Sequence, residues 1–195
     1  MGDLATTPQE ITRVYLDTEF TKFSRPQLIS LALVAESGQE FYGESTDFVR
    51  VQCCDFVVEN VLPILHGGHI AASLDDLRVK LVDWLATLSS PAEIISDFDG
   101  DIDLLLKLLR ISAKEIGRYN IAALTVLDGE FVKSESFNRA LNDYFTNVDS
   151  RRHHALVDAR ALMCAHVATN FHDFQESPQN HENDFTLKGE AISFE

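Results

Sequence analysis

The chain has 195 residues, of which 45% are hydrophobic, and this favours one domain with a buried core over two independent domains. Its formal net charge of −15 argues against a broad basic surface for duplex nucleic acid or for an anionic membrane. The chain has three cysteines, no signal-peptide pattern at its amino terminus and no apolar run of about 20 residues, which predicts a cytoplasmic protein that does not span a membrane.

The expected elements alternate between strands and helices. A meander of three strands over 13–17, 28–35 and 40–45 is followed by a short helix within 57–65 and a capped helix over 74–88. The remaining elements are a strand over 93–96, a helix over 101–109, a strand over 119–127 and helices over 136–145 and 157–171. This order predicts an α/β fold in which helices flank a mixed β-sheet.

The ends of the chain differ in composition from its middle. We expect a flexible amino terminus over 1–10, one folded domain over 11–172, and an acidic, loosely held tail over 173–195.

The first candidate motif ends the apolar run of residues 14–20. Asp17 and Glu19 are separated by one residue there, so they point to the same side near the carboxyl end of a buried strand. Two adjacent carboxylates repel each other, and a hard divalent cation such as magnesium makes the arrangement favourable. A solvated turn is the alternative interpretation of this pair.

The second candidate motif is the aspartate-rich segment 97–103, between a strand and a helix. Aspartates are common at helix starts because they cap the helix and complement its dipole. Four aspartates in seven residues exceed the need of one cap. Ligands of open α/β sheets collect beyond the carboxyl ends of strands, where both acidic segments are expected.

The third candidate motif begins a helix and contains His153 and Asp158. A histidine accepts a proton near neutral pH, and a nearby carboxylate can hold a metal. A helix cap with solvated histidines is the alternative. Together, the three segments supply the four carboxylates and the base of a two-metal phosphodiester site.

These three segments resemble, in order, the motifs of the DEDDh 3′-to-5′ exonucleases. The matching sequences are LDTEF (16–20), DFDGDID (97–103) and HHALVDA (153–159). The superfamily includes RNase T, oligoribonuclease and polymerase proofreading subunits, and the likeness is greatest to a small bacterial and phage exoribonuclease-like branch. It implies an RNase H-like mixed sheet and hydrolysis of single-stranded nucleic acid from its 3′ end.

The resemblance also implies roles for single residues. Asp17, Glu19 and Asp158 become ligands of two Mg²⁺ or Mn²⁺ ions. His153 becomes the general base, and it is preferred over His154 because the family has four residues between its histidine and aspartate. The middle ligand is assigned to Asp101, with Asp97 and Asp103 as alternatives, because Gly100 stands where family members often have an aromatic residue.

Substrate contacts follow from the same resemblance. Thr18 and Phe20 are expected to flank the terminal nucleotide, the first at the ribose and the second by stacking. Phe23 is assigned to stacking or to core packing, and Arg152 to the phosphate chain or to solvent. Asp97 occupies the position of a family asparagine beside the substrate.

The sequence therefore predicts a metal-dependent exonuclease, with RNA favoured over DNA. The partner is the 3′ end of a single strand rather than a membrane, and a homodimer, common among relatives, is left open. A magnesium-dependent phosphohydrolase of mononucleotides and a non-catalytic nucleic-acid-binding relative are the alternatives. His66 and His69 flank two glycines without an evident third ligand, and they are interpreted as loop residues.

Overall fold

The computed structural model describes residues 10–176, with side chains described up to residue 170. Its strands form one sheet in the order β4-β3-β2-β1-β5-β6. They are β1 (Thr12–Phe20), β2 (Leu28–Ala35), β3 (Glu40–Ser45), β4 (Ala71–Ala72), β5 (Ala92–Ser96) and β6 (Ile121–Val126). β1, β2 and β3 pair antiparallel, whereas β5 and β6 join β1 in parallel, so the mixed sheet with its meander is confirmed.

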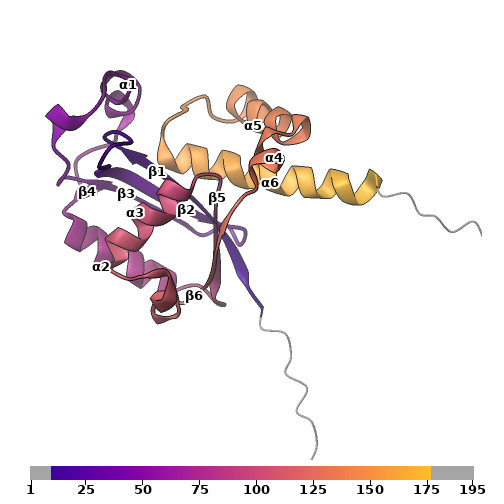
Figure 1. Cartoon of the computed structure of the whole chain (residues 1–195), viewed down its shortest axis with the longest axis horizontal. Coiled ribbons are helices and arrows are strands. Elements are labelled where there is room, and N and C mark those ends of the chain that lie inside the picture. Colours follow the sequence, from indigo (N-terminus) through magenta and orange to yellow (C-terminus); the bar gives the residue numbers. More distant parts are fainter. Residues whose placement is uncertain (1–9, 177–195) are drawn as a thin grey trace, which may run out of the picture.

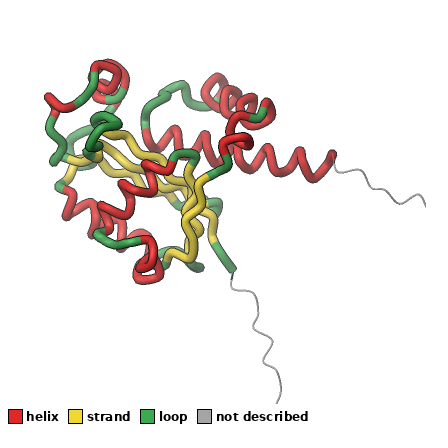
Figure 2. The backbone as a smooth tube through the Cα atoms, in the orientation of Figure 1, coloured by secondary structure: helices red, strands yellow, loops and turns green. Residues whose placement is uncertain are grey.

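Helices cover both faces of this sheet (Figures 1 and 2). The α-helices are α1 (Asp55–Asn60), α2 (Leu74–Ala86), α3 (Asp99–Leu109), α4 (Gly129–Lys133), α5 (Glu135–Asn147) and α6 (Ala155–Glu176). Leucines of α2 and α3 form the main core with one face of the sheet, while α5 and α6 pack on the other. None of the helices in the described range is long and apolar enough to cross a membrane.

The expected elements are present with shifted ends. Strand β1 continues to Phe20, α3 begins at Asp99, and the helix expected within 57–65 is α1 followed by a 3₁₀ turn at Leu62–Ile64. Pro63 in that turn lacks an N–H, which explains why α1 does not continue. Sequence patterns missed β4, α4 and the 3₁₀ segment Ala113–Tyr119, all of which lack a sustained apolar period.

Helix α6 is longer than the helix expected over 157–171. It continues to Glu176 and so includes the first residues of the segment assigned to the acidic tail. The rest of the predicted tail, and residues 1–9 of the predicted flexible terminus, lie outside the described residues.

The alternation of side chains along β1 determines where its carboxylates point. Val14 and Leu16 belong to the core shared with α2 and α3, whereas Tyr15 packs on the other face with residues of α6. Asp17 and Glu19 lie two and four residues after Tyr15. Side chains two residues apart in a strand point to the same face, so both face the α6 side of the sheet. The expectation that they share one side is confirmed.

Alanines let α6 approach the sheet closely. Ala155 and Ala159 are fully buried against Ala32 and Val34 of β2. Because Ala159 directly follows Asp158, the short distance between helix and sheet also determines how near Asp158 lies to the β1 carboxylates.

We therefore expect Ala159→Leu to destabilise the fold and to move Asp158. Overpacking of a close-packed core costs about 1–3 kcal/mol. Thermal unfolding would measure the loss, with Ala86→Leu as the control, because Ala86 is exposed at the end of α2. Equal unfolding temperatures for the two variants would contradict this account of the α6 contact.

Candidate active site

One cavity of about 290 Å³ brings the three motif segments together. Asp17 and Glu19 line it from the end of β1, and Asp101 lines it from the first turn of α3. His153 and Asp158 line it from the loop before α6 and from the first turn of that helix. Residues that are far apart in the sequence thus converge on the same volume, as the motifs require.

Among the described residues, no ion pair is formed by the carboxylates of this cavity, although Lys22 also lines it. Ligand atoms of Glu19, His153 and Asp158 lie within 4.8 Å of one another. Asp158 accepts a hydrogen bond from the His153 N–H at 2.8 Å through Oδ2, but its Oδ1 is buried and has no donor in the described part of the chain. Oδ2 of Asp17 is likewise buried and unpartnered. Such buried carboxylate oxygens are costly unless a donor or a cation satisfies them.

Burial and mutual repulsion raise the pKa values of these carboxyl groups. The pKa of Asp17 is raised well above its usual value by burial and by the charges of Asp101, Asp158 and Glu19. Burial, with Asp158 and Asp101, raises the pKa of Glu19 to about 9. Burial raises the pKa of Asp158 to about 7, although the His153 N–H and Arg152 oppose this shift. The cluster therefore favours protons or cations.

Asp101 is the most constrained carboxylate of the cavity. It is 3% exposed, and it accepts hydrogen bonds from the Thr18 hydroxyl at 2.6 Å and from the Ser96 hydroxyl at 2.8 Å. Burial raises its pKa to about 6 against the effect of these two bonds. The Thr18 hydroxyl was expected at a ribose, but here its hydrogen is donated to Asp101.

The three candidate middle aspartates differ in position. Asp97 is exposed as a whole residue, but its carboxyl faces the protein at the cavity, where partial desolvation raises its pKa. Asp103 is exposed and is not among the residues that line the cavity. Asp101 alone combines deep burial with an oriented carboxylate.

Gly100, the departure from the family pattern, has a steric explanation. A Cβ atom at position 100 would overlap the ring of Phe98. That ring stacks near Phe20 with centroids 6.1 Å apart and meets Phe23 edge-on at 6.1 Å. Phe98 therefore supplies an aromatic face where Gly100 supplies none.

His153 has an unusual backbone and a neutral side chain. Its φ of 67° lies in the left-handed region, which costs a non-glycine residue free energy unless its surroundings hold it. Its ring meets the edge of Phe56 at 4.8 Å. Burial and the charge of Arg152 lower its pKa, so the imidazole is neutral at pH 7 and free to accept a proton.

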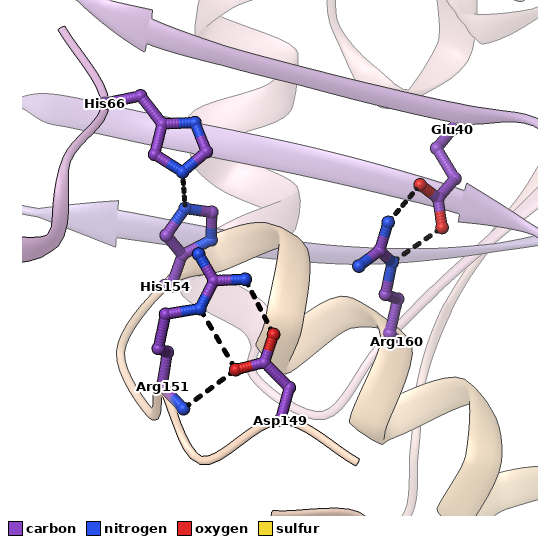
Figure 3. Close-up of polar contacts among 6 residues, drawn as sticks. All are labelled: Glu40, His66, Asp149, Arg151, His154 and Arg160. Carbon is purple, nitrogen blue, oxygen red and sulfur yellow. Dashed lines mark hydrogen bonds and ion pairs between the residues drawn. The ribbon is translucent and has the colours of Figure 1, made fainter.

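Arg152 lines a second, smaller cavity of about 170 Å³, which shares Asp17, Asp97, His153 and Asp158 with the first. Its guanidinium lies 3.9 Å from the centroid of the Phe145 ring and donates to Asn142 at 2.8 Å. Arg151 instead pairs with Asp149 (Figure 3). Arg152, which the sequence assigned to the phosphate chain or to solvent, is therefore the arginine beside the carboxylates.

Sequence reasoning missed several residues of the cavity or its support, among them Phe98, Ser96 and Phe56. Phe98 lies inside the second motif, where its position between two aspartates was a usable signal. Ser96, which orients Asp101, ends the strand before that motif. Phe56 lies in the short helix α1 and has no local signal, because its contact with His153 arises only from folding.

The fold is similar to that of a solved nuclease. No family model and no curated protein matches the chain. Among solved structures, exonuclease I is similar, with a TM-score of 0.53 at 10% identity over 81% of this chain and 40% of that chain. This chain thus spans less than half the length of that protein. At this identity the likeness establishes the fold alone, and the expected RNase H-like α/β fold is confirmed.

The residues of the cavity fit hard divalent cations. Carboxylate oxygens predominate, one imidazole is within reach, and two of the oxygens lack other partners. Mg²⁺ and Mn²⁺ prefer such oxygen ligands, while softer metals prefer sites with more nitrogen and sulfur.

Stability of the metal-free protein should fall as pH rises from about 7 to about 9. In this window the folded chain retains protons on Glu19 and Asp17 that the unfolded chain has already released. In the same window an unfolded histidine, with its ordinary pKa of about 6.5, is mostly neutral. The lowered pKa values of His153, His154 and His166 keep these groups neutral in the folded chain as well. Thermal unfolding temperatures recorded in a chelator across this pH range measure the effect. Glu19→Gln is the control, and its unfolding temperature should fall less steeply with pH. A rise in unfolding temperature over the window would contradict it.

Substitution of the middle aspartates should identify the metal ligand. We expect Asp101→Asn to abolish most of the increase in unfolding temperature that Mn²⁺ produces, because an amide oxygen is a weaker ligand than a carboxylate. Asp103→Asn is the matched control and should respond to Mn²⁺ as the parent does, because Asp103 lies outside the cavity. If only Asp97→Asn loses the Mn²⁺-induced increase in unfolding temperature, Asp97 rather than Asp101 is the metal ligand.

Proposed function

We propose that this chain is a metal-dependent 3′-to-5′ exonuclease of the DEDDh type, with single-stranded RNA as its preferred substrate. The observation that carries the proposal is the convergence of Asp17, Glu19, Asp101, His153 and Asp158 on one cavity. Their order and spacing resemble the family motifs, and the fold is similar to that of exonuclease I. The exoribonuclease-like branch is proposed on the sequence resemblance.

The roles of the cavity residues follow from their chemistry. Asp17, Glu19, Asp101 and Asp158 would hold two divalent ions, Mg²⁺ or Mn²⁺. When bound, such ions activate water and neutralise the charge on the attacked phosphate and the leaving oxygen. His153, neutral and half-buried, takes the proton of the attacking water. Its N–H bond to Asp158 couples the base to the ligand set.

The aromatic residues suit the bases of a single strand. Phe20, Phe23 and Phe98 form contacts at the cavity mouth, with Phe20 and Phe23 centroids 5.3 Å apart. Stacking on such rings is tolerant of base sequence and contributes about 1–3 kcal/mol per base. Thr18 approaches the sugar mainly through its backbone, because its hydroxyl is bonded to Asp101.

The exposure of these rings favours a polymer over a mononucleotide. Phe23 is 82% exposed and Phe98 is 38% exposed, so the apolar surface extends beyond the cavity that holds the carboxylates. A second nucleotide has a surface to stack on there. Arg152, which lines the smaller cavity, is suited to contact the phosphate chain. Asp97, which lines both cavities, is suited to contact the terminal nucleotide.

The decisive experiment is incubation of the protein with Mn²⁺ and 5′-labelled single-stranded RNA or DNA. We expect a ladder of products shortened from the 3′ end, faster on RNA. His153→Ala should lose about 100-fold or more of the turnover, as expected for loss of a general base, while retaining the Mn²⁺-induced rise in unfolding temperature.

Asp17→Asn and Asp103→Asn serve as the paired controls. The first removes a proposed ligand and should abolish turnover, whereas the second should leave it unchanged. Hydrolysis of mononucleotides without any shortening of the labelled strand would contradict the exonuclease proposal and favour a phosphohydrolase. Binding of the strand without turnover at any metal concentration would favour a non-catalytic binding protein.

A further inference from the structure

A hydrogen-bonded histidine pair lies beside the proposed base, with His154 buried and His66 exposed. His154 directly follows His153 but is only 2% exposed, and its Nε2 lies 3.2 Å from Nε2 of His66 (Figure 3). The His154 ring stacks on Tyr42 of β3 with centroids 4.8 Å apart. His66 lies in the loop after α1, as expected from the sequence, but its ring contacts a histidine 88 residues away rather than His69.

The loop that carries His66 is fixed to β3 by a buried carboxylate. Glu44, 2% exposed, accepts hydrogen bonds from the His66 N–H at 2.6 Å and from the Gly67 N–H at 2.8 Å. It also accepts the Tyr42 hydroxyl at 2.7 Å. Tyr42 thus contacts the carboxylate that holds the loop and the ring of His154, so the pair is joined to the sheet from both sides.

The surroundings of His154 indicate which ring nitrogen donates. Its Nδ1 is buried and has no partner among the described residues. A buried bare acceptor costs less than a buried unpaired N–H, so the hydrogen belongs on Nε2 and is donated to Nε2 of His66. Burial, Arg151 and His66 also lower the pKa of His154, which agrees with a neutral His154 ring.

The pair is connected to His153 through a short and strained backbone. The His154 carbonyl accepts the N–H groups of Val157 and Asp158 at 2.7 and 3.0 Å, which begins α6. Immediately before it, His153 has its φ of 67° and donates its N–H to Asp158. A left-handed residue between a loop and a helix needs its neighbours to be held in place.

We propose that the His66–His154 pair positions His153, so that His66 and His154 are positioning residues rather than catalytic ones. The proposal rests on the proposed function, in which His153 is the general base. Because the His154 ring is anchored, the backbone at residue 154 is fixed, and this determines where the side chain of the preceding residue, His153, points. The same bond also joins the loop after α1 to the start of α6, and α1 carries Phe56, which contacts the His153 ring.

The test combines kinetics with amide exchange. Displacement of a reacting group by about 1 Å costs on the order of 100-fold in rate. We therefore expect His66→Ala to lower kcat by about 10–100-fold on labelled RNA with little change in KM, and to leave the Mn²⁺-induced rise in unfolding temperature intact. His66→Gln should restore most of kcat, because its carbonyl can accept the His154 hydrogen. His69→Ala, in the same loop, is the control that should change nothing.

Introducing His66→Ala into a protein that already carries His153→Ala separates positioning of the base from general destabilisation. If the pair acts through His153, His66→Ala should cause no further loss of kcat in a His153→Ala protein. An equal loss in both backgrounds would overturn the proposal.

Hydrogen exchange of the His153 amide, which is bonded to Asp158, should quicken in metal-free His66→Ala. Unchanged exchange would also overturn it. A parent protein without nuclease activity would refute the proposed function, while exchange would still decide whether the pair fixes His153.

Discussion

The mutual repulsion of four half-buried or buried carboxylates is the constraint on which the rest of the structure depends. They meet where β1, α3 and α6 converge, and nothing in the described part of the chain neutralises them directly. The apolar core beneath β1 and the alanine face of α6 hold them together against that repulsion. Close packing thus stabilises an arrangement that electrostatics alone opposes.

The same constraint explains the polar contacts around the carboxylates. Two hydroxyls orient Asp101, and one backbone N–H orients Asp158, so these groups keep their directions without being neutralised. Donors that are neutral leave the negative charge available to a cation. A lysine or arginine bonded directly to each carboxylate would have stabilised the fold more and removed the site, which is a common conflict between stability and function.

The parts of this arrangement that depend on local periodicity could be predicted from the sequence. Alternation along β1 placed Asp17 and Glu19 on one face, and the start of a helix accounted for Asp158. The steric exclusion between Phe98 and Gly100 could not be predicted, because it depends on where a side chain turns after folding. The His66–His154 bond spans 88 residues and follows no sequence period, so only the assembled sheet reveals it.

Under the proposed function, an acidic chain must bind a polyanion, and this needs attraction from sources other than its net charge. Bound divalent cations would reverse the potential at the carboxylates, where an unliganded site repels phosphate. Stacking on Phe20, Phe23 and Phe98 requires no charge, and Arg152 adds one local cation beside the ligand set. Because the chain as a whole carries a formal charge of −15, attraction of this kind favours a strand end at the cavity over the body of a duplex.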